Sequence, residues 1–142
     1  MKSLVVYFSK GGKTRKVAEA IAQELNCQAI DIKKKIPDIA AVNLLVIGSG
    51  NYGGKPGKEL QEFLEHLQSP SKIKIAFFAT SGRPEPKCIE VMQEIVESKG
   101  FIFLSEFDCR GKMFLLNRDH PTQDDLRNAK LFAKKLKELI AE

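Results

Sequence analysis

The sequence predicts an α/β fold in which helices cover both faces of a parallel sheet. Strand-like and helix-like segments alternate along the chain, and most strand-like segments are near-continuous apolar runs. Both features are expected of parallel strands, which are connected by helices and buried on both faces. The length of 142 residues fits a single domain covering 1–142, and the 43% of apolar residues is enough to build its core.

Five strands and four helices are predicted. The first strand covers 2–8 (KSLVVYF), and the others cover 27–32, 42–47, 73–79 and 101–107. Apolar residues recur at helical spacing in the segments 17–25, 60–67, 89–96 and 126–140. Thr122, with Asp125 three residues later, predicts the start of the last helix.

Composition favours a cytoplasmic protein without membrane insertion. No apolar run approaches the ~20 residues that span a bilayer, and the N-terminus lacks the features of a secretory signal. The cysteines, Cys27, Cys88 and Cys109, are few and widely spaced, which indicates a reducing compartment. We expect them to be small buried apolar residues, with Cys109 placed in a loop. With only His66 and His120 besides, no metal site is predicted.

The loop after the first strand carries the chemistry of a phosphate site. Adjacent glycines expose backbone N–H groups at a helix N-terminus, and hydroxyls and ammonium groups surround them. The residues are Ser9, Lys10, Gly11, Gly12, Lys13 and Thr14. A plain strand-to-helix turn is the alternative. A nucleotide-hydrolysing P-loop is disfavoured, because that motif needs a glycine where Tyr7 stands.

Two loops resemble those of the flavodoxin family. The segment VVYFSKGGKT is similar to the family's phosphate loop, [ST]-x-[ST]-G-x-T, with Gly11 replacing the central hydroxyl residue. The segment 48–54 (GSGNYGG) resembles the pattern G-S-x-x-[WY]-G, and Tyr52 falls on the aromatic that stacks on the flavin. The resemblance implies a flavodoxin-like three-layer sandwich with a five-stranded sheet in the order 2-1-3-4-5.

A third loop, 79–84, falls where the family contacts the flavin from its other side. Many flavodoxins place a second aromatic there, and this chain has none nearby. The segments 111–112 and 120–126 also look like the family's final loop and helix start. The loops after the third and fourth strands thus add these cofactor-binding residues to those of 9–14: Gly50, Asn51, Tyr52, Gly53, Gly54, Thr80, Ser81, Gly82 and Arg83.

The resemblance implies non-covalent FMN and a role as a one- or two-electron carrier. Residues 9–14 would hold the phosphate, 50–53 would line one face and edge of the flavin, and 80–83 would line the other face. A peptide near 52–54 would hydrogen-bond flavin N5 in one redox state. Two other functions stay open: an FMN-dependent NAD(P)H:quinone-type oxidoreductase, and a flavin-free binding module.

Charge adds a hypothesis about the partner. Flavodoxins are commonly acidic, whereas this chain has a net charge of +5. Eight basic residues fall in or beside the predicted site loops: Lys10, Lys13, Lys55, Lys58, Arg83, Lys87, Arg110 and Lys112. They predict a basic rim that docks an acidic, ferredoxin-like redox partner, or else a generally basic surface. Nucleic acid is not expected, because no such motif is present. We expect a monomer or weak dimer.

Overall fold

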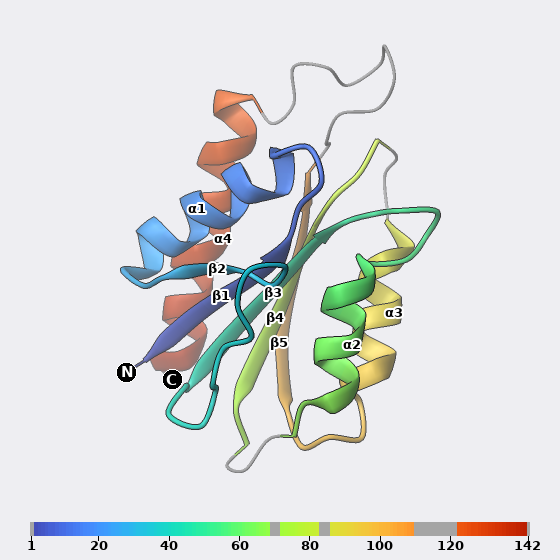
Figure 1. Ribbon diagram of the computed structural model, residues 1–142. Coiled ribbons are helices and arrows are strands. Elements are labelled where there is room, and N and C mark those ends of the chain that lie inside the picture. The colour runs from blue at the N-terminus through green and yellow to red at the C-terminus, as the bar shows by residue number, and fades with distance from the viewer. Residues whose placement is uncertain (1, 69–71, 83–85, 110–121, 142) are drawn as a thin grey trace.

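The computed structural model describes residues 2–68, 72–82, 86–109 and 122–141. Its strands form one parallel sheet in the order β2-β1-β3-β4-β5, which confirms the prediction (Figure 1). They are β1 (Ser3–Phe8), β2 (Ala29–Asp31), β3 (Leu44–Gly50), β4 (Lys74–Thr80) and β5 (Ile102–Cys109). The chain reverses its direction of winding between β1 and β3, and parallel sheets bind ligands beside such a reversal.

The three central strands have apolar sequences because helices cover both of their faces. Every residue of β1 and β3 is buried, and in β4 only Lys74 is partly exposed. The edge strand β2 is shorter than the predicted 27–32. Asp31 ends it, because its side chain and carbonyl accept the N–H groups of the next residues and turn the chain away.

The edge strand β5 is longer than predicted and less buried. Ile102 and Phe103 are 41% and 49% exposed. The expectation that Cys109 lies in a loop is wrong, because Cys109 is the buried last residue of β5. Its backbone pairs with Thr80, and its carbonyl accepts the Ser81 N–H at 2.9 Å, so the strand continues two residues beyond Phe107.

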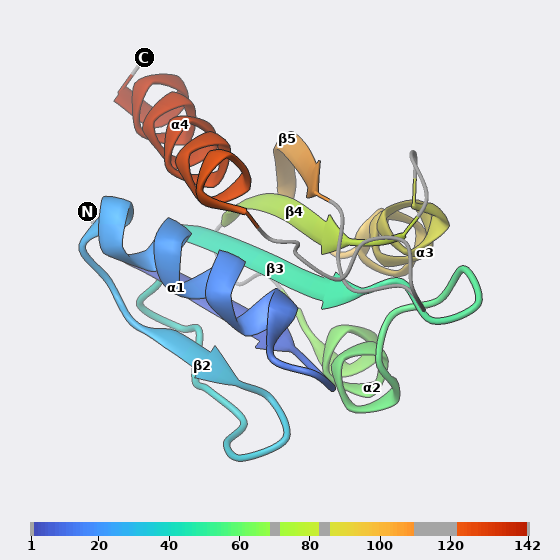
Figure 2. The same ribbon diagram turned by 90° about the horizontal axis from the view of Figure 1, so that it is seen from above.

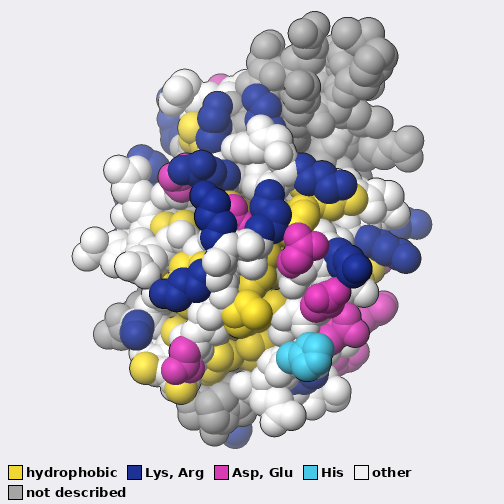
Figure 3. Space-filling view, in the orientation of Figure 1, with side chains coloured by type: hydrophobic (Ala, Val, Ile, Leu, Met, Phe, Trp, Pro, Cys, Tyr) yellow, Lys and Arg dark blue, Asp and Glu magenta, His cyan; other side chains and the backbone are white. Residues whose placement is uncertain are grey.

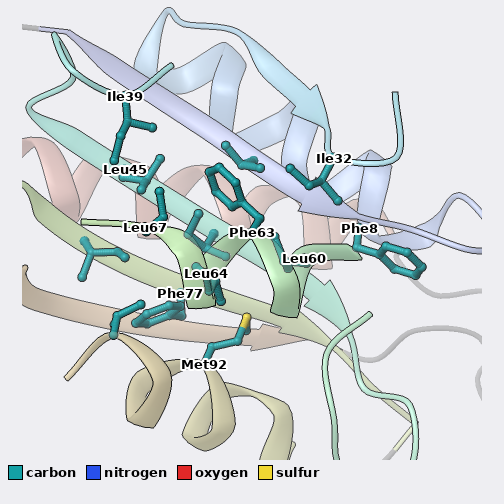
Figure 4. Close-up of a cluster of buried hydrophobic side chains, with 14 of the residues drawn as sticks. Phe8, Ile32, Ile39, Leu45, Leu60, Phe63, Leu64, Leu67, Phe77 and Met92 are labelled. Atoms are coloured by element: carbon teal, nitrogen blue, oxygen red, sulfur yellow. The ribbon is translucent and has the colours of Figure 1, made fainter. Parts of the chain in front are cut away.

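The described helices form two layers, one on each face of the sheet. Figure 2 shows both layers from above. They are α1 (Lys13–Leu25), α2 (Lys58–His66), α3 (Lys87–Val96) and α4 (Gln123–Ala141). α1 and α4 pack on one face, and α2 and α3 pack on the other (Figure 1). Each layer encloses its own core. Figure 4 shows the core under α2 and α3, which includes Leu64, Phe77 and Met92.

The start of α4 confirms the predicted cap. The Thr122 N–H donates to Asp125 Oδ2 at 2.8 Å, and the Asp125 N–H donates to Thr122 Oγ1 at 3.2 Å. This reciprocal pair satisfies two N–H groups that a helix start leaves without partners. None of the helices in the described ranges is long and apolar enough to cross a membrane.

The strand register brings three loops to one edge of the sheet. Phe8 at the end of β1 pairs with Ser49, and Gly50 at the end of β3 pairs with Thr80 at the end of β4. The loops that follow these strands therefore meet at the carboxyl edge of the sheet, at the top of Figure 1. The described site residues predicted from the sequence lie in these loops or at the ends of the strands and helix beside them, and Arg83 lies outside the described residues.

Candidate functional site

The loop after β1 is a compact turn that leads directly into α1. Ser9 Oγ accepts a hydrogen bond from the Gly12 N–H at 3.0 Å and so closes the turn. Gly12 has a φ of +89°, a left-handed conformation in which a larger residue would be strained. Gly12 is also the N-cap of α1 and forms no side-chain cap. The positive end of the helix dipole therefore faces the loop, as in anion-binding turns.

The outer side of this loop is open. A Cβ placed on Gly11 or Gly12 would meet no heavy atom of the described structure within 4 Å. Lys10 is exposed and Lys13 is partly exposed. The loop thus combines an open approach with the start of a helix and two ammonium groups, which are donors that suit a phosphate group.

Thr14 connects this loop to the end of β4. Its hydroxyl lies 2.7 Å from the hydroxyl of Thr80, and the two form a buried hydrogen bond. Thr80 also accepts the Asn51 N–H through its carbonyl at 3.0 Å. Residues from all three predicted loops are therefore joined by direct hydrogen bonds.

The loop after β3 folds into a short hairpin whose turn has two residues. The Tyr52 N–H donates to the Lys55 carbonyl at 2.8 Å, and the Lys55 N–H donates to the Tyr52 carbonyl at 3.2 Å. Between them, Gly53 and Gly54 have φ angles of +63° and +86°. Two successive left-handed residues are what a type I′ turn requires, and glycine adopts them at the lowest cost. The glycine pair therefore fixes the position of Tyr52 at the base of the hairpin.

Tyr52 lies between this hairpin and the loop after β1. Its hydroxyl accepts the Lys10 N–H at 3.3 Å, and the Lys10 ammonium lies 4.5 Å from the centre of its ring. Phe8 meets the ring edge-on, with ring centres 5.7 Å apart. Gly50 leaves room for the ring, since a Cβ there would lie 2.6 Å from Tyr52 Oη. Burial raises the pKa of the Tyr52 phenol above its usual value, so it stays protonated at neutral pH.

Asn51 has a role that sequence reasoning missed. Its Oδ1 accepts the N–H of Cys88 in the first turn of α3 at 3.0 Å. The N-cap residue of α3, Pro86, makes no side-chain cap, so Asn51 supplies one from a neighbouring loop. The Asn51 amide oxygen is therefore engaged in holding α3 against the hairpin. The signal available in the sequence was its residue type, since asparagine is a common capping residue.

The loop after β4 is described as far as Gly82. Thr80 and Ser81 are buried, and Gly82 is partly exposed. The Ser81 N–H bonds to the Cys109 carbonyl, so this loop begins as a continuation of the pairing between β4 and β5. Thr80 and Ser81 therefore serve first as structural anchors at the edge of the site.

Two further residues shape the site. Ser49 belongs to the recognised motif, and its buried hydroxyl donates to the Gly50 carbonyl at 2.7 Å and accepts the Gly57 N–H at 3.0 Å. It closes the base of the loop that carries Tyr52. Lys33, which the sequence analysis did not place here, donates through Nζ to the Ser9 carbonyl at 2.5 Å. It could have been found from the strand order, because β2 and β1 are neighbours.

Basic side chains gather around these loops. Lys10 lies on the loop after β1, and Lys13 begins α1. Lys55 closes the hairpin, Lys58 begins α2, and Lys87 begins α3 beside Gly54. In Figure 3, which has the orientation of Figure 1, many Lys and Arg side chains lie in the upper part of the visible surface. Of the predicted rim, Arg83, Arg110 and Lys112 lie outside the described residues.

These features define a class: doubly wound α/β proteins with a glycine-containing turn from the first strand into a helix and an aromatic hairpin after the neighbouring strand. The chain belongs to the flavodoxin family. A family model described as a flavodoxin domain matches residues 4–100, which is more than half of the sequence. The resemblance inferred from the loop motifs is thereby confirmed.

Individual proteins and solved structures are also similar to this chain. An uncharacterized protein of Methanocaldococcus jannaschii is 39% identical over 148 residues, covering 96% of this chain and 98% of the relative. Among solved structures, a flavodoxin from the domain Archaea has a TM-score of 0.73 at 19% identity, with full coverage of both chains. Rubredoxin oxygen:oxidoreductase of Desulfovibrio gigas has a TM-score of 0.77 at 17% identity, covering 99% of this chain and 37% of that one. At these identities the structural likeness shows the shared fold.

Proposed function

We propose that this protein binds FMN non-covalently and carries electrons between other proteins. The observation that carries this proposal is the contact between Tyr52 and Lys10, which joins an aromatic hairpin to an anion-binding turn. FMN has a flat ring system at one end and a phosphate at the other. The two recognition surfaces adjoin at the edge of the sheet where ligands of this fold class bind.

The turn after β1 suits the phosphate end. A phosphate monoester is an anion with several acceptor oxygens, and the turn offers N–H groups at the start of α1 and the ammonium groups of Lys10 and Lys13. Glycine at positions 11 and 12 keeps side chains away from the approach. This donor set fits the group.

The hairpin suits the ring end. Tyr52 offers an aromatic face, and the peptides of Gly53 and Gly54 at the turn offer backbone donors and acceptors for a flavin edge. Thr80, Ser81 and Gly82 would line the opposite side, with Arg83 following them. When bound, FMN supplies the one- or two-electron chemistry, and the protein supplies position and electrostatics.

The basic rim suggests the class of redox partner. Lysines around the strand ends would attract an acidic, ferredoxin-like protein to the edge where the flavin would lie. Such steering weakens with salt, so the rate of electron exchange with an acidic partner should fall steeply between low and physiological ionic strength. A rate independent of ionic strength would contradict this choice of partner.

Titration of the protein with FMN tests the central proposal. We expect quenched flavin fluorescence and a shifted absorption spectrum, weakened in Tyr52→Ala and largely retained in Tyr52→Phe, which keeps the aromatic face. Phe103→Ala, an aromatic truncation on β5, serves as the control. No binding at micromolar FMN would refute the cofactor. Bleaching of the bound flavin by NAD(P)H alone would instead favour the reductase alternative.

A further inference from the structure

Lys33 reaches the anion-binding turn from the neighbouring strand. β2 pairs in parallel with β1, with Tyr7 opposite Asp31, and the Ile32 N–H continues the pairing by donating to the Tyr7 carbonyl at 3.0 Å. Lys33 and Ser9 each stand two residues beyond this last pair, and the Lys33 side chain bonds to the Ser9 carbonyl. The strand order thus brings a residue distant in the chain to the first residue of the turn.

The backbone of Lys33 is held in place by Asp31. The Asp31 carboxylate accepts the Lys33 N–H at 2.9 Å, and the Asp31 carbonyl accepts the Lys34 N–H at 2.9 Å. From this turn the Lys33 side chain crosses the end of β1. Its ammonium lies 5.2 Å from the centre of the Phe8 ring and bonds to the Ser9 carbonyl.

The peptide that joins Ser9 to Lys10 is therefore held at both of its polar groups. Its C=O accepts from Lys33 at 2.5 Å, and its N–H donates to Tyr52 at 3.3 Å. A carbonyl oxygen carries partial negative charge and repels an anion, whereas N–H groups attract one. Lys33 bonds to the Ser9 carbonyl from the side of β2. The negative end of this peptide therefore faces a cation at the start of the turn.

We propose that Lys33 is a positioning residue of the phosphate site. It fixes the orientation of the Ser9–Lys10 peptide and adds a third positive charge to those of Lys10 and Lys13. This inference rests on the proposed function, because it concerns the same turn. It deepens that function by making the turn selective for a phosphorylated flavin over the same flavin without its phosphate.

Paired substitutions test the proposal. Lys33→Met removes the ammonium that bonds to the Ser9 carbonyl. Lys34→Met removes the same charge one residue later, at a residue whose backbone N–H bonds to the Asp31 carbonyl. Dissociation constants for FMN and for riboflavin, which lacks the phosphate, are measured with each variant. We expect Lys33→Met to weaken FMN binding by about tenfold, as for loss of a charge-assisted hydrogen bond, with little change for riboflavin. Lys34→Met should change neither affinity by more than about twofold, and Lys33→Arg should restore FMN binding.

Equal losses in Lys33→Met and Lys34→Met would overturn the proposal, since long-range charge alone would explain them. Equal losses for FMN and riboflavin would also overturn it. A flavin-independent readout uses inorganic phosphate and the NMR shifts of the amide groups of residues 10–13. Phosphate-induced shifts that are present in the wild type and lost in Lys33→Met support the proposal even if FMN does not bind. Absence of these shifts in the wild type would refute the phosphate site itself.

Discussion

The hydroxyl of Thr14 in α1 lies 2.7 Å from the hydroxyl of Thr80 at the end of β4, although 66 positions separate the two residues in the chain. Both side chains are buried, so this hydrogen bond connects the start of α1, next to the turn after β1, with the end of β4. A buried hydroxyl without a partner lowers the free energy of unfolding. Moving the two loops apart would therefore destabilise the fold.

Substitution of either threonine by valine should destabilise the fold. Thr14→Val and Thr80→Val each leave the other hydroxyl without its partner, which costs about 1–2 kcal/mol of unfolding free energy. The double variant removes both polar groups and should cost less than the sum of the two single changes. Urea denaturation of the four proteins measures the coupling. Strict additivity would show that the hydrogen bond contributes nothing.

The cap that Asn51 provides to α3 predicts a second effect on stability. Asn51→Ala removes the acceptor of the Cys88 N–H and should lower the unfolding free energy by about 1 kcal/mol. Asn51→Asp keeps an acceptor at a helix N-terminus and should retain most of the stability. Thermal unfolding compares the two variants, and equal losses would argue against the capping role.

Two glycines near the site should respond differently to alanine. A Cβ on Gly57 would lie 2.2 Å from the Phe8 ring, so Gly57→Ala should cost about 1–3 kcal/mol through overpacking. Gly53 has open space around it, and Gly53→Ala should cost about 1 kcal/mol from its φ of +63° alone. Denaturation midpoints test the order. A larger loss for Gly53→Ala would contradict the close packing of Gly57 on Phe8.

The raised pKa values of the buried cysteine thiols predict that the protein is less stable in alkaline solution. Burial raises the pKa of the Cys88 thiol from its usual 9.0 to about 12. As the pH rises above 9, the unfolded chain loses this proton first, so the unfolding free energy falls between about pH 9 and pH 12. One such thiol contributes a slope of up to about 1.4 kcal/mol per pH unit.

Cys88→Ala should therefore flatten the alkaline part of the stability curve. Denaturation from pH 7 to pH 11 measures the slope in both proteins. The slope that remains in the variant comes from the other titrating groups, which include Cys109 and Tyr52 with their raised pKa values. Below pH 9 the difference between the two proteins should be constant. An unchanged alkaline slope in the variant would contradict the burial of this thiol.

The sequence was sufficient for the element order and for the loops, because both depend on local patterns. Apolar runs marked β1, β3 and β4, and the glycine-rich segments followed two of them. The extent of β5 was not predictable in this way, because Cys109 is held by pairing with Thr80 on another strand.

The contacts inside the site were also beyond local patterns. The roles of Lys33 and Asn51 come from hydrogen bonds to residues 24 and 37 positions away, which exist only once the strands are in register. Tyr52 was recognised from its motif, but its hydroxyl contact with Lys10 depends on the meeting of two loops. Residue type and spacing indicated the site, and the strand register determined how it is assembled.

The two edge strands of the sheet differ in how readily they could pair with a strand of another molecule in concentrated solution. β2 presents only three residues before the chain turns away, so it offers little template for an added strand. β5 is eight residues long, pairs within the described chain only with β4, and exposes Ile102 and Phe103. Self-association by strand addition would therefore start at β5, which β3 and β4 separate from β1. Polar substitutions of Ile102 and Phe103 would lower this tendency without changing the turn after β1.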